Sequence, residues 1–114
     1  MRYIIEDKKY SFKSAFDTVT GAYVRTGILD ENGKDTGVDP FMASYPHLID
    51  VGIMGHCIHG KTGLCAKAGI GCYQSGLLVE KPNMSVEDFR WIAGQSKGRC
   101  NQFALGGRGD PDQH

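Results

Sequence analysis

The sequence predicts an α/β protein, and three segments of its second half carry that prediction. A mostly apolar run over residues 47–54 lies between Pro46 and Gly55, as expected of a strand that is buried on both faces. A helix is predicted to start after Ser85, and a second strand to cover residues 100–105. Strand, helix and strand in this order predict a βαβ unit with two parallel strands and a right-handed crossover.

The N-terminal part, residues 1–45, is predicted to be an irregular preamble that holds one β-hairpin. Residues 22–29 have the apolar and β-branched composition of a strand, and Asn32-Gly33 is a strong hairpin turn signal. Residues 46–114 then form the second part of the chain.

The predicted helix has a clear start and an apolar stripe. The Ser85 hydroxyl can cap the first backbone amides, and the acidic pair that follows complements the positive end of the helix dipole. Apolar residues recur at roughly helical spacing and are expected to face the core. They are Val86, Phe89, Trp91 and Ile92, and Gly94 and Gly98 are expected to end the helix.

Composition excludes several classes of function. The chain has 114 residues, with 13 basic and 13 acidic side chains. Recognition of a nucleic acid through a basic field needs an excess of positive charge, which this sequence lacks. No apolar run approaches the roughly 20 residues that cross a bilayer, and charges interrupt the apolar start of the chain too early for a signal peptide. We therefore expect a cytoplasmic protein with no membrane partner.

Three of the four cysteines, Cys57, Cys65 and Cys72, lie within sixteen residues in a glycine-rich stretch that follows the first predicted strand of the second part. In a reducing compartment such a cluster favours metal binding or chemistry over disulfides. Cys100 begins the second predicted strand, where a buried structural thiol is expected.

Three interpretations of this stretch compete with a fourth, in which the thiols are unrelated. Residues 55–62 match the phosphate-binding pattern G-x-x-x-x-G-K-[ST] and follow a predicted strand, but glycines interrupt the helix that this loop needs. A zinc site would use the three cysteines with His56 or His59, although spacings of seven and six residues do not form zinc knuckles. An iron-sulfur cubane would bind the three thiolates and leave one iron open.

The arrangement as a whole resembles the N-terminal part of the radical S-adenosylmethionine (SAM) superfamily, and it is similar to bacterial members, some of which carry a further C-terminal cluster region of the SPASM type. In that family a three-cysteine loop follows the first strand. A helix and a second strand then lead to a Gly-Gly-Glu-Pro-like loop, which Gly106-Gly107-Arg108-Gly109-Asp110-Pro111 resembles here. Arg108 replaces the family's acidic residue, and the spacing C-x7-C-x6-C is wider than the common C-x3-C-x2-C.

The resemblance implies a fold, cofactors and site residues. It implies the start of a partial (β/α)6 TIM-like barrel, truncated after its second strand, so that the 114-residue chain alone would be inactive. Cys57, Cys65 and Cys72 would bind a [4Fe-4S] cluster, and Gly106, Gly107, Arg108 and Tyr73 would contact SAM. The enzyme would cleave SAM reductively to a 5'-deoxyadenosyl radical, with flavodoxin or ferredoxin as electron donor and a peptide or protein as substrate.

Overall fold

The computed structural model describes residues 1–74, 76 and 80–114 of the chain. These residues divide into two compact units. The first unit comprises residues 1–48 and 97–102, and the second comprises residues 49–96 and 103–114.

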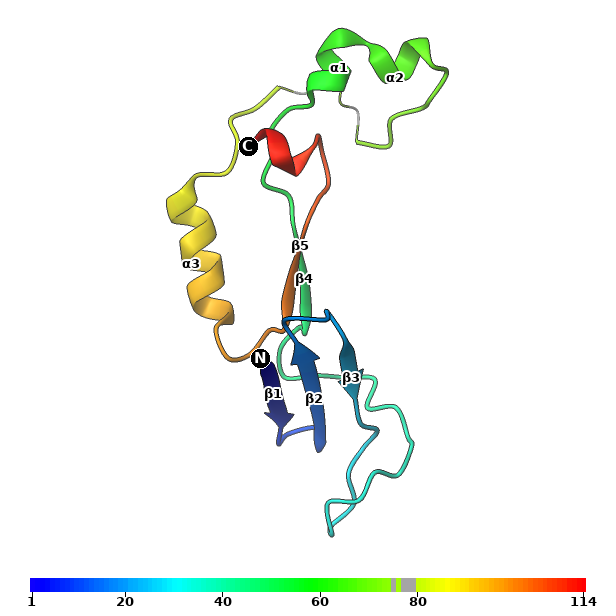
Figure 1. The fold of residues 1–114 in the computed structure, drawn as a ribbon, viewed down its shortest axis with the longest axis vertical. Helices are drawn as coiled ribbons and strands as arrows, with labels where there is room; N and C mark the ends of the chain where they lie inside the picture. The colour runs from blue at the N-terminus through cyan, green and yellow to red at the C-terminus, as the bar shows by residue number, and fades with distance from the viewer. Residues whose placement is uncertain (75, 77–79) are drawn as a thin grey trace. The chain divides into compact units, whose positions relative to one another are not determined.

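The first unit is built on an antiparallel sheet of three strands in the order β1-β2-β3, drawn in blue in Figure 1. The strands are β1 (Arg2–Asp7), β2 (Phe12–Asp17) and β3 (Tyr23–Arg25). Arg2 lies opposite Asp17 and Asp7 lies opposite Phe12, so the first hairpin is in register along its whole length. The Phe12 side chain, only 1% exposed, is the largest fully buried side chain of the described residues.

Two aspartates form the turns between these strands. The Asp7 carboxylate accepts hydrogen bonds from the backbone amides of Lys9 and Tyr10, each at 3.1 Å. The Asp17 carboxylate accepts in the same way from Val19 and Thr20, at 2.9 and 3.1 Å. Such Asx turns reverse the chain at both corners, and the turn after Asp17 also uses Gly21, whose φ is 73°.

The hairpin predicted around Asn32-Gly33 is reduced to one isolated antiparallel bridge, between Leu29 and Asp35. The strand predicted over residues 22–29 is shorter, because β3 ends at Arg25 and pairs back with β2. Gly33 has φ 76°, as the turn signal requires, but the residues after it do not form a regular return strand.

Two strands of the predicted βαβ unit are present. They are β4 (Leu48–Val51) and β5 (Gln102–Leu105), and they form a sheet of their own. The Asn101 amide donates to the His47 carbonyl at 2.9 Å and the Gly106 amide to the Val51 carbonyl at 3.2 Å. Residue numbers therefore rise together along both strands, which makes the pair parallel as predicted.

The helix α3 (Val86–Ser96) lies beside this pair of strands (Figure 1). Its start is as predicted, because the Ser85 hydroxyl accepts a hydrogen bond from the Asp88 amide at 3.0 Å. Phe89 and Ile92 pack against the core of the second unit, which consists of Val51, Ile53 and Met54. Three short helices complete this unit: α1 (Ile58–Thr62), α2 (Leu64–Lys67) and the 3-10 helix η1 (Pro111–Gln113).

Trp91 does not join the core, contrary to the prediction from helical spacing. Its side chain is 69% exposed, and Val86 on the same predicted stripe is 52% exposed. The helix packs on only two strands, so its buried stripe is narrow and leaves these two side chains in solvent.

The predicted partial (β/α)6 barrel is wrong. A barrel needs several parallel strands side by side. The described residues instead hold one antiparallel sheet of three strands and one pair of parallel strands, with only short helices. No helix among the described residues is long and apolar enough to cross a membrane.

Candidate metal centre

The cysteine loop follows β4 and the core residues Ile53 and Met54, and it starts at Gly55. Its two ends are joined at Gly55, whose carbonyl accepts from the Lys81 amide at 3.0 Å and whose amide donates to the Asn83 side-chain oxygen at 3.0 Å. A side chain at Gly55 would collide with the backbone carbonyls of Lys81 and Pro82. Glycine is therefore needed here for close backbone approach, and the loop closes on itself directly before Cys57.

Cys57 is placed by the helix that it begins. It is the N-cap of α1, and its sulfur accepts a hydrogen bond from the Gly60 amide at 3.4 Å. Gly63, with φ 67°, ends α1 in the left-handed conformation, and α2 follows at once with Cys65 in its first turn. The two short helices thus set the spacing between the first two cysteines.

Gly76 brings the first and third cysteines together. A Cβ atom on this glycine would lie 3.5 Å from the Cys72 sulfur and 3.7 Å from the Cys57 sulfur, so both sulfurs face one point. The Gly76 amide also donates to the Cys72 sulfur at 3.3 Å. None of the four cysteines, all within the described residues, forms a disulfide.

The three cysteines line one pocket of about 200 Å³ together with the glycine-rich loop that follows β5. Six of the seven predicted site residues line it, and the remaining predicted residue, Gly106, does not. The six are Cys57, Cys65, Cys72, Tyr73, Gly107 and Arg108, while His59, Gln74, Gly76, Gly109 and Asp110 complete the lining. The Gly106 amide instead bonds the end of β4.

The glycine-rich loop is fixed against the cysteine loop at two points. Gly109, with φ 72°, lies so close to Cys57 that an added Cβ would be 3.4 Å from the Cys57 Cα and would collide with the His56 carbonyl. The Arg108 Nε donates to the Gln74 carbonyl at 3.3 Å. The sequence prediction did not include Gly76 or Gly109 in the site, and only their place in a glycine-rich stretch indicated them.

The pocket brings thiol sulfurs and backbone amides together. Among the described residues, no group of three or more His, Cys, Asp and Glu side chains is close enough to hold one metal ion. A cubane spreads its ligands, because each thiolate binds a different iron, and backbone amides that donate to the sulfurs are a regular feature of such sites. The amides of Gly60 and Gly76 supply that feature here.

The predicted phosphate-binding loop, residues 55–62, does not have the geometry that a phosphate needs. A phosphate loop leads into a helix whose first amides are unpaired. Here the helix α1 ends at Thr62, and the Lys61 amide donates to the Cys57 carbonyl at 3.0 Å. The Lys61 ammonium forms an ion pair with Glu80, and the hydrogen bond from Lys61 lowers the pKa of that carboxyl.

Cys100 belongs to the first unit and does not line this pocket. Its thiol donates to the carbonyls of His47 and Gln102, at 3.3 and 3.2 Å. These contacts agree with the structural role predicted for it. His59 lines the pocket of the candidate metal centre, and His56 is not among the residues that line it.

A comparison with known proteins gives no match to a family model, to a curated protein or to a solved structure.

Proposed function

We propose that the second unit binds a [4Fe-4S] cluster and SAM, and that the chain is the cofactor-binding part of a cytoplasmic radical SAM enzyme. The observation that carries the proposal is the pocket that the three cysteines share with the loop after β5. The sequence resemblance calls for these two loops side by side, at the carboxyl ends of two parallel strands. The proposal rests on this site and not on a barrel.

Each part of the pocket has a task that its structure supports. Cys57, Cys65 and Cys72 would provide three thiolates, the soft ligands that iron-sulfur clusters require. The amides of Gly60 and Gly76 would donate to two of the sulfurs, which raises the reduction potential of a cluster. When both cofactors are bound, they supply one-electron cleavage of the sulfonium to methionine and a 5'-deoxyadenosyl radical.

The loop after β5 would form the SAM side of the pocket. Gly107 and Gly109 adopt positive φ angles of 86° and 72°, a left-handed conformation that glycine takes without strain. Arg108 holds this loop against the cysteine loop through its bond to the Gln74 carbonyl. Because Arg108 stands where the family has an acidic residue, backbone carbonyls of the loop would contact the methionine amino group. Tyr73, 85% exposed, would cover the cofactor at the rim.

The partners in this proposal are those of the family. A flavodoxin or ferredoxin would supply the electron, and a peptide or protein would be the substrate.

The test is anaerobic reconstitution of the intact chain with iron and sulfide. We expect about four irons per chain and absorbance near about 400 nm, as for thiolate-bound clusters. Addition of SAM should change the electron paramagnetic resonance spectrum of the reduced cluster. Serine in place of Cys57, Cys65 or Cys72 should abolish iron binding, whereas Cys100→Ser should retain it, because Cys100 bonds only within the first unit.

A zinc site is the second candidate, because His59 lines the same pocket as the three cysteines. One zinc per chain in a colourless protein, lost in both His59→Ala and Cys65→Ser, would establish this site and refute the cluster. A cluster that forms but does not respond to SAM would retain the metal centre and refute radical SAM chemistry.

A further inference from the structure

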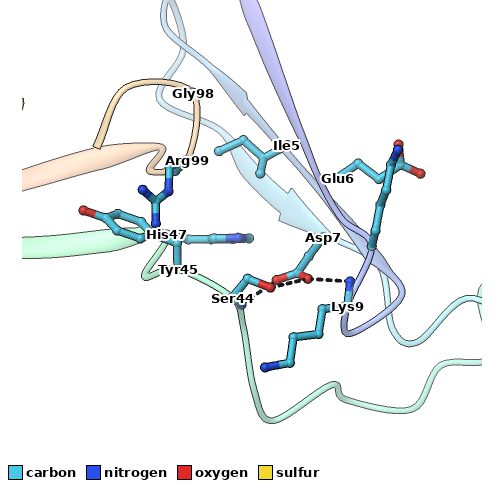
Figure 2. A pocket seen from close by; sticks show the side chains of 10 residues that line it. Ile5, Glu6, Asp7, Lys9, Ser44, Tyr45, His47, Gly98 and Arg99 are labelled. Carbon is cyan, nitrogen blue, oxygen red and sulfur yellow. Dashed lines mark hydrogen bonds between the residues drawn. The ribbon is translucent and has the colours of Figure 1, made fainter. Parts of the chain in front are cut away.

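A polar pocket of about 310 Å³ in the first unit has no role in the proposed function. Its walls come from the turn after β1, the segment before β4 and the residues Gly98-Arg99 (Figure 2). We call it the Arg99 pocket. The side chains that define it are Asp7, Lys8, Lys9, Tyr45, His47 and Arg99.

One wall is held by Asp7, which is only 7% exposed. Its carboxylate accepts four hydrogen bonds: two from the turn amides of Lys9 and Tyr10, one from the Ser44 amide at 2.6 Å and one from the Ser44 hydroxyl at 2.8 Å. Dashed lines in Figure 2 mark the bonds of Asp7 to Lys9 and Ser44. These hydrogen bonds fix the Asp7 side chain in the wall of the pocket. The Asp7 carboxylate forms no ion pair with a cation of the lining.

Arg99 is held on the other wall by an aromatic ring. Its guanidinium lies over the Tyr45 ring, 4.1 Å from the ring centre (Figure 2). Stacking of this kind holds the plane of the guanidinium and leaves its N–H edge available. Among the described residues, Arg99 forms no ion pair with a carboxylate.

The positive charge of the pocket is not balanced within it. Lys8 and Lys9 lie on the wall of the turn, and neither forms an ion pair within the described part of the chain. The remaining carboxylate of the lining, Glu6, pairs with Lys13 at 3.4 Å. Three cations therefore line a pocket with two carboxylates. Glu6 pairs with Lys13 outside the lining, and Asp7 accepts hydrogen bonds only from uncharged donors, so the lining keeps an excess of positive charge.

His47 adds an uncharged polar group to the lining. Its Nδ1 is hydrogen-bonded to the Tyr23 hydroxyl at 3.0 Å, and its ring packs on Phe12 with the ring centres 5.4 Å apart. Burial lowers the pKa of His47, so the imidazole is uncharged near neutral pH. With Nδ1 engaged, Nε2 is the ring nitrogen left for a ligand.

We propose that the Arg99 pocket binds the phosphate group of a small phosphorylated molecule. A guanidinium fork matches two phosphate oxygens, and two lysines supply the charge that a dianion needs. The pocket has room for more than the phosphate, which makes a small organic phosphate a better fit than the bare ion. This site is independent of the cysteines, so neither proposal depends on the other.

The experiment follows the backbone amides of the intact chain by nuclear magnetic resonance during titration with phenyl phosphate, inorganic phosphate and sulfate. Phenyl phosphate should cause saturable shifts at Lys9, Gly98 and Arg99, with weaker binding of inorganic phosphate and weaker still of sulfate. Arg99→Met should weaken the binding of phenyl phosphate about tenfold, the loss typical of a charge-assisted hydrogen bond. Lys34→Met is the matched control, because it removes one exposed cation outside the pocket.

A second variant keeps the test valid if Arg99→Met perturbs the fold. Lys8→Ala combined with Lys9→Ala removes two exposed charges whose side chains lie on the surface, and it should weaken binding similarly. Equal losses in these variants and in Lys34→Met would overturn the proposal, because they would indicate attraction by overall charge alone. Sulfate binding as tightly as phenyl phosphate would also overturn it.

Discussion

At the residue scale, Asp7 links the first hairpin to the segment before β4. Burial of its carboxyl raises the pKa, but the hydrogen bonds from Ser44, Tyr10 and Lys9 outweigh burial, so the pKa of Asp7 lies below its ordinary value of 3.8. The folded protein thus holds the charged form more strongly than the unfolded chain does.

We predict that Asp7→Asn lowers the free energy of unfolding by about 1–3 kcal/mol at neutral pH, because the NH2 group that replaces one carboxylate oxygen cannot accept a hydrogen bond from the buried donors. In the unchanged protein, the stabilisation that the charged Asp7 gives the folded state is complete above the ordinary pKa of the carboxyl. It is lost as the pH falls through the lowered pKa of the folded protein. Urea unfolding of both proteins from about pH 7 down to about pH 3 measures this. The difference between their free energies of unfolding should shrink only below about pH 4.

Asp39→Asn is the control for this prediction. Asp39 forms an exposed ion pair with Arg25 at 2.8 Å, and such pairs contribute at most about 1 kcal/mol. A loss at Asp39 as large as that at Asp7 would contradict the role given to the buried carboxylate.

Gly109 gives a second test at this scale. Alanine there would strain a left-handed backbone, at about 1–2 kcal/mol, and would also collide with the His56 carbonyl. We predict that Gly109→Ala separates the two loops and sharply reduces iron uptake on reconstitution. Gly69→Ala strains a similar φ of 73° with nothing within 4 Å of its Cβ, so it should retain iron. Equal iron contents would disprove the close approach of the loops.

At the scale of elements, the helix α3 depends on its cap. We predict that Ser85→Ala destabilises the protein by about 1 kcal/mol, because the Asp88 amide loses its partner at the helix start. Ser85→Asp should retain the stability, since aspartate caps equally well. Thermal unfolding followed by circular dichroism measures both, and an unchanged midpoint in Ser85→Ala would show that the cap is dispensable.

The elements that sequence reasoning predicted are those with strong local signals. An apolar run indicated β4, and a capping serine with apolar residues at helical spacing indicated α3. The strands β1 and β2 were missed because their turn over residues 8–11 holds no glycine, proline or asparagine. Ser11 adopts φ 52° there, and the side chain of Asp7 supplies the turn. An aspartate directly before a turn was the available signal.

The sequence predicted the residues that line the candidate site better than it predicted the fold. The order of strand, cysteine loop, helix, strand and glycine loop brings six predicted residues to one pocket, because neighbouring parallel strands end at the same edge. Contacts that depend on backbone approach, at Gly76 and Gly109, have no sequence pattern of their own. The barrel was wrong because the described residues supply only one pair of parallel strands, too few to form part of a closed barrel.

At the scale of the whole molecule, the described residues bury little apolar surface. The buried apolar side chains are Phe12 in the first unit and Val51, Ile53 and Met54 in the second. Small cores of this kind supply little stability without a metal or another constraint. A ligand that binds only the folded form adds its binding energy to folding.

We therefore predict that anaerobic loading with iron and sulfide raises the thermal unfolding midpoint by at least about 4 °C, the shift that about 1 kcal/mol produces in a domain of this size. Scanning calorimetry of loaded and metal-free protein measures it. Cys65→Ser should show no shift, whereas Cys100→Ser should behave as the unchanged protein does. A rise in Cys65→Ser would mean that the added iron acts outside the pocket.

The exposure of Trp91 has a practical consequence. It is the chain's single tryptophan, it lies on α3, and its indole is 69% in solvent, so its fluorescence arises from one known position. An iron-sulfur cluster absorbs light broadly and quenches nearby indole emission by energy transfer. The protein thus carries its own optical probe for cofactor loading, one that reports from the same compact unit as the cysteines and needs no added dye.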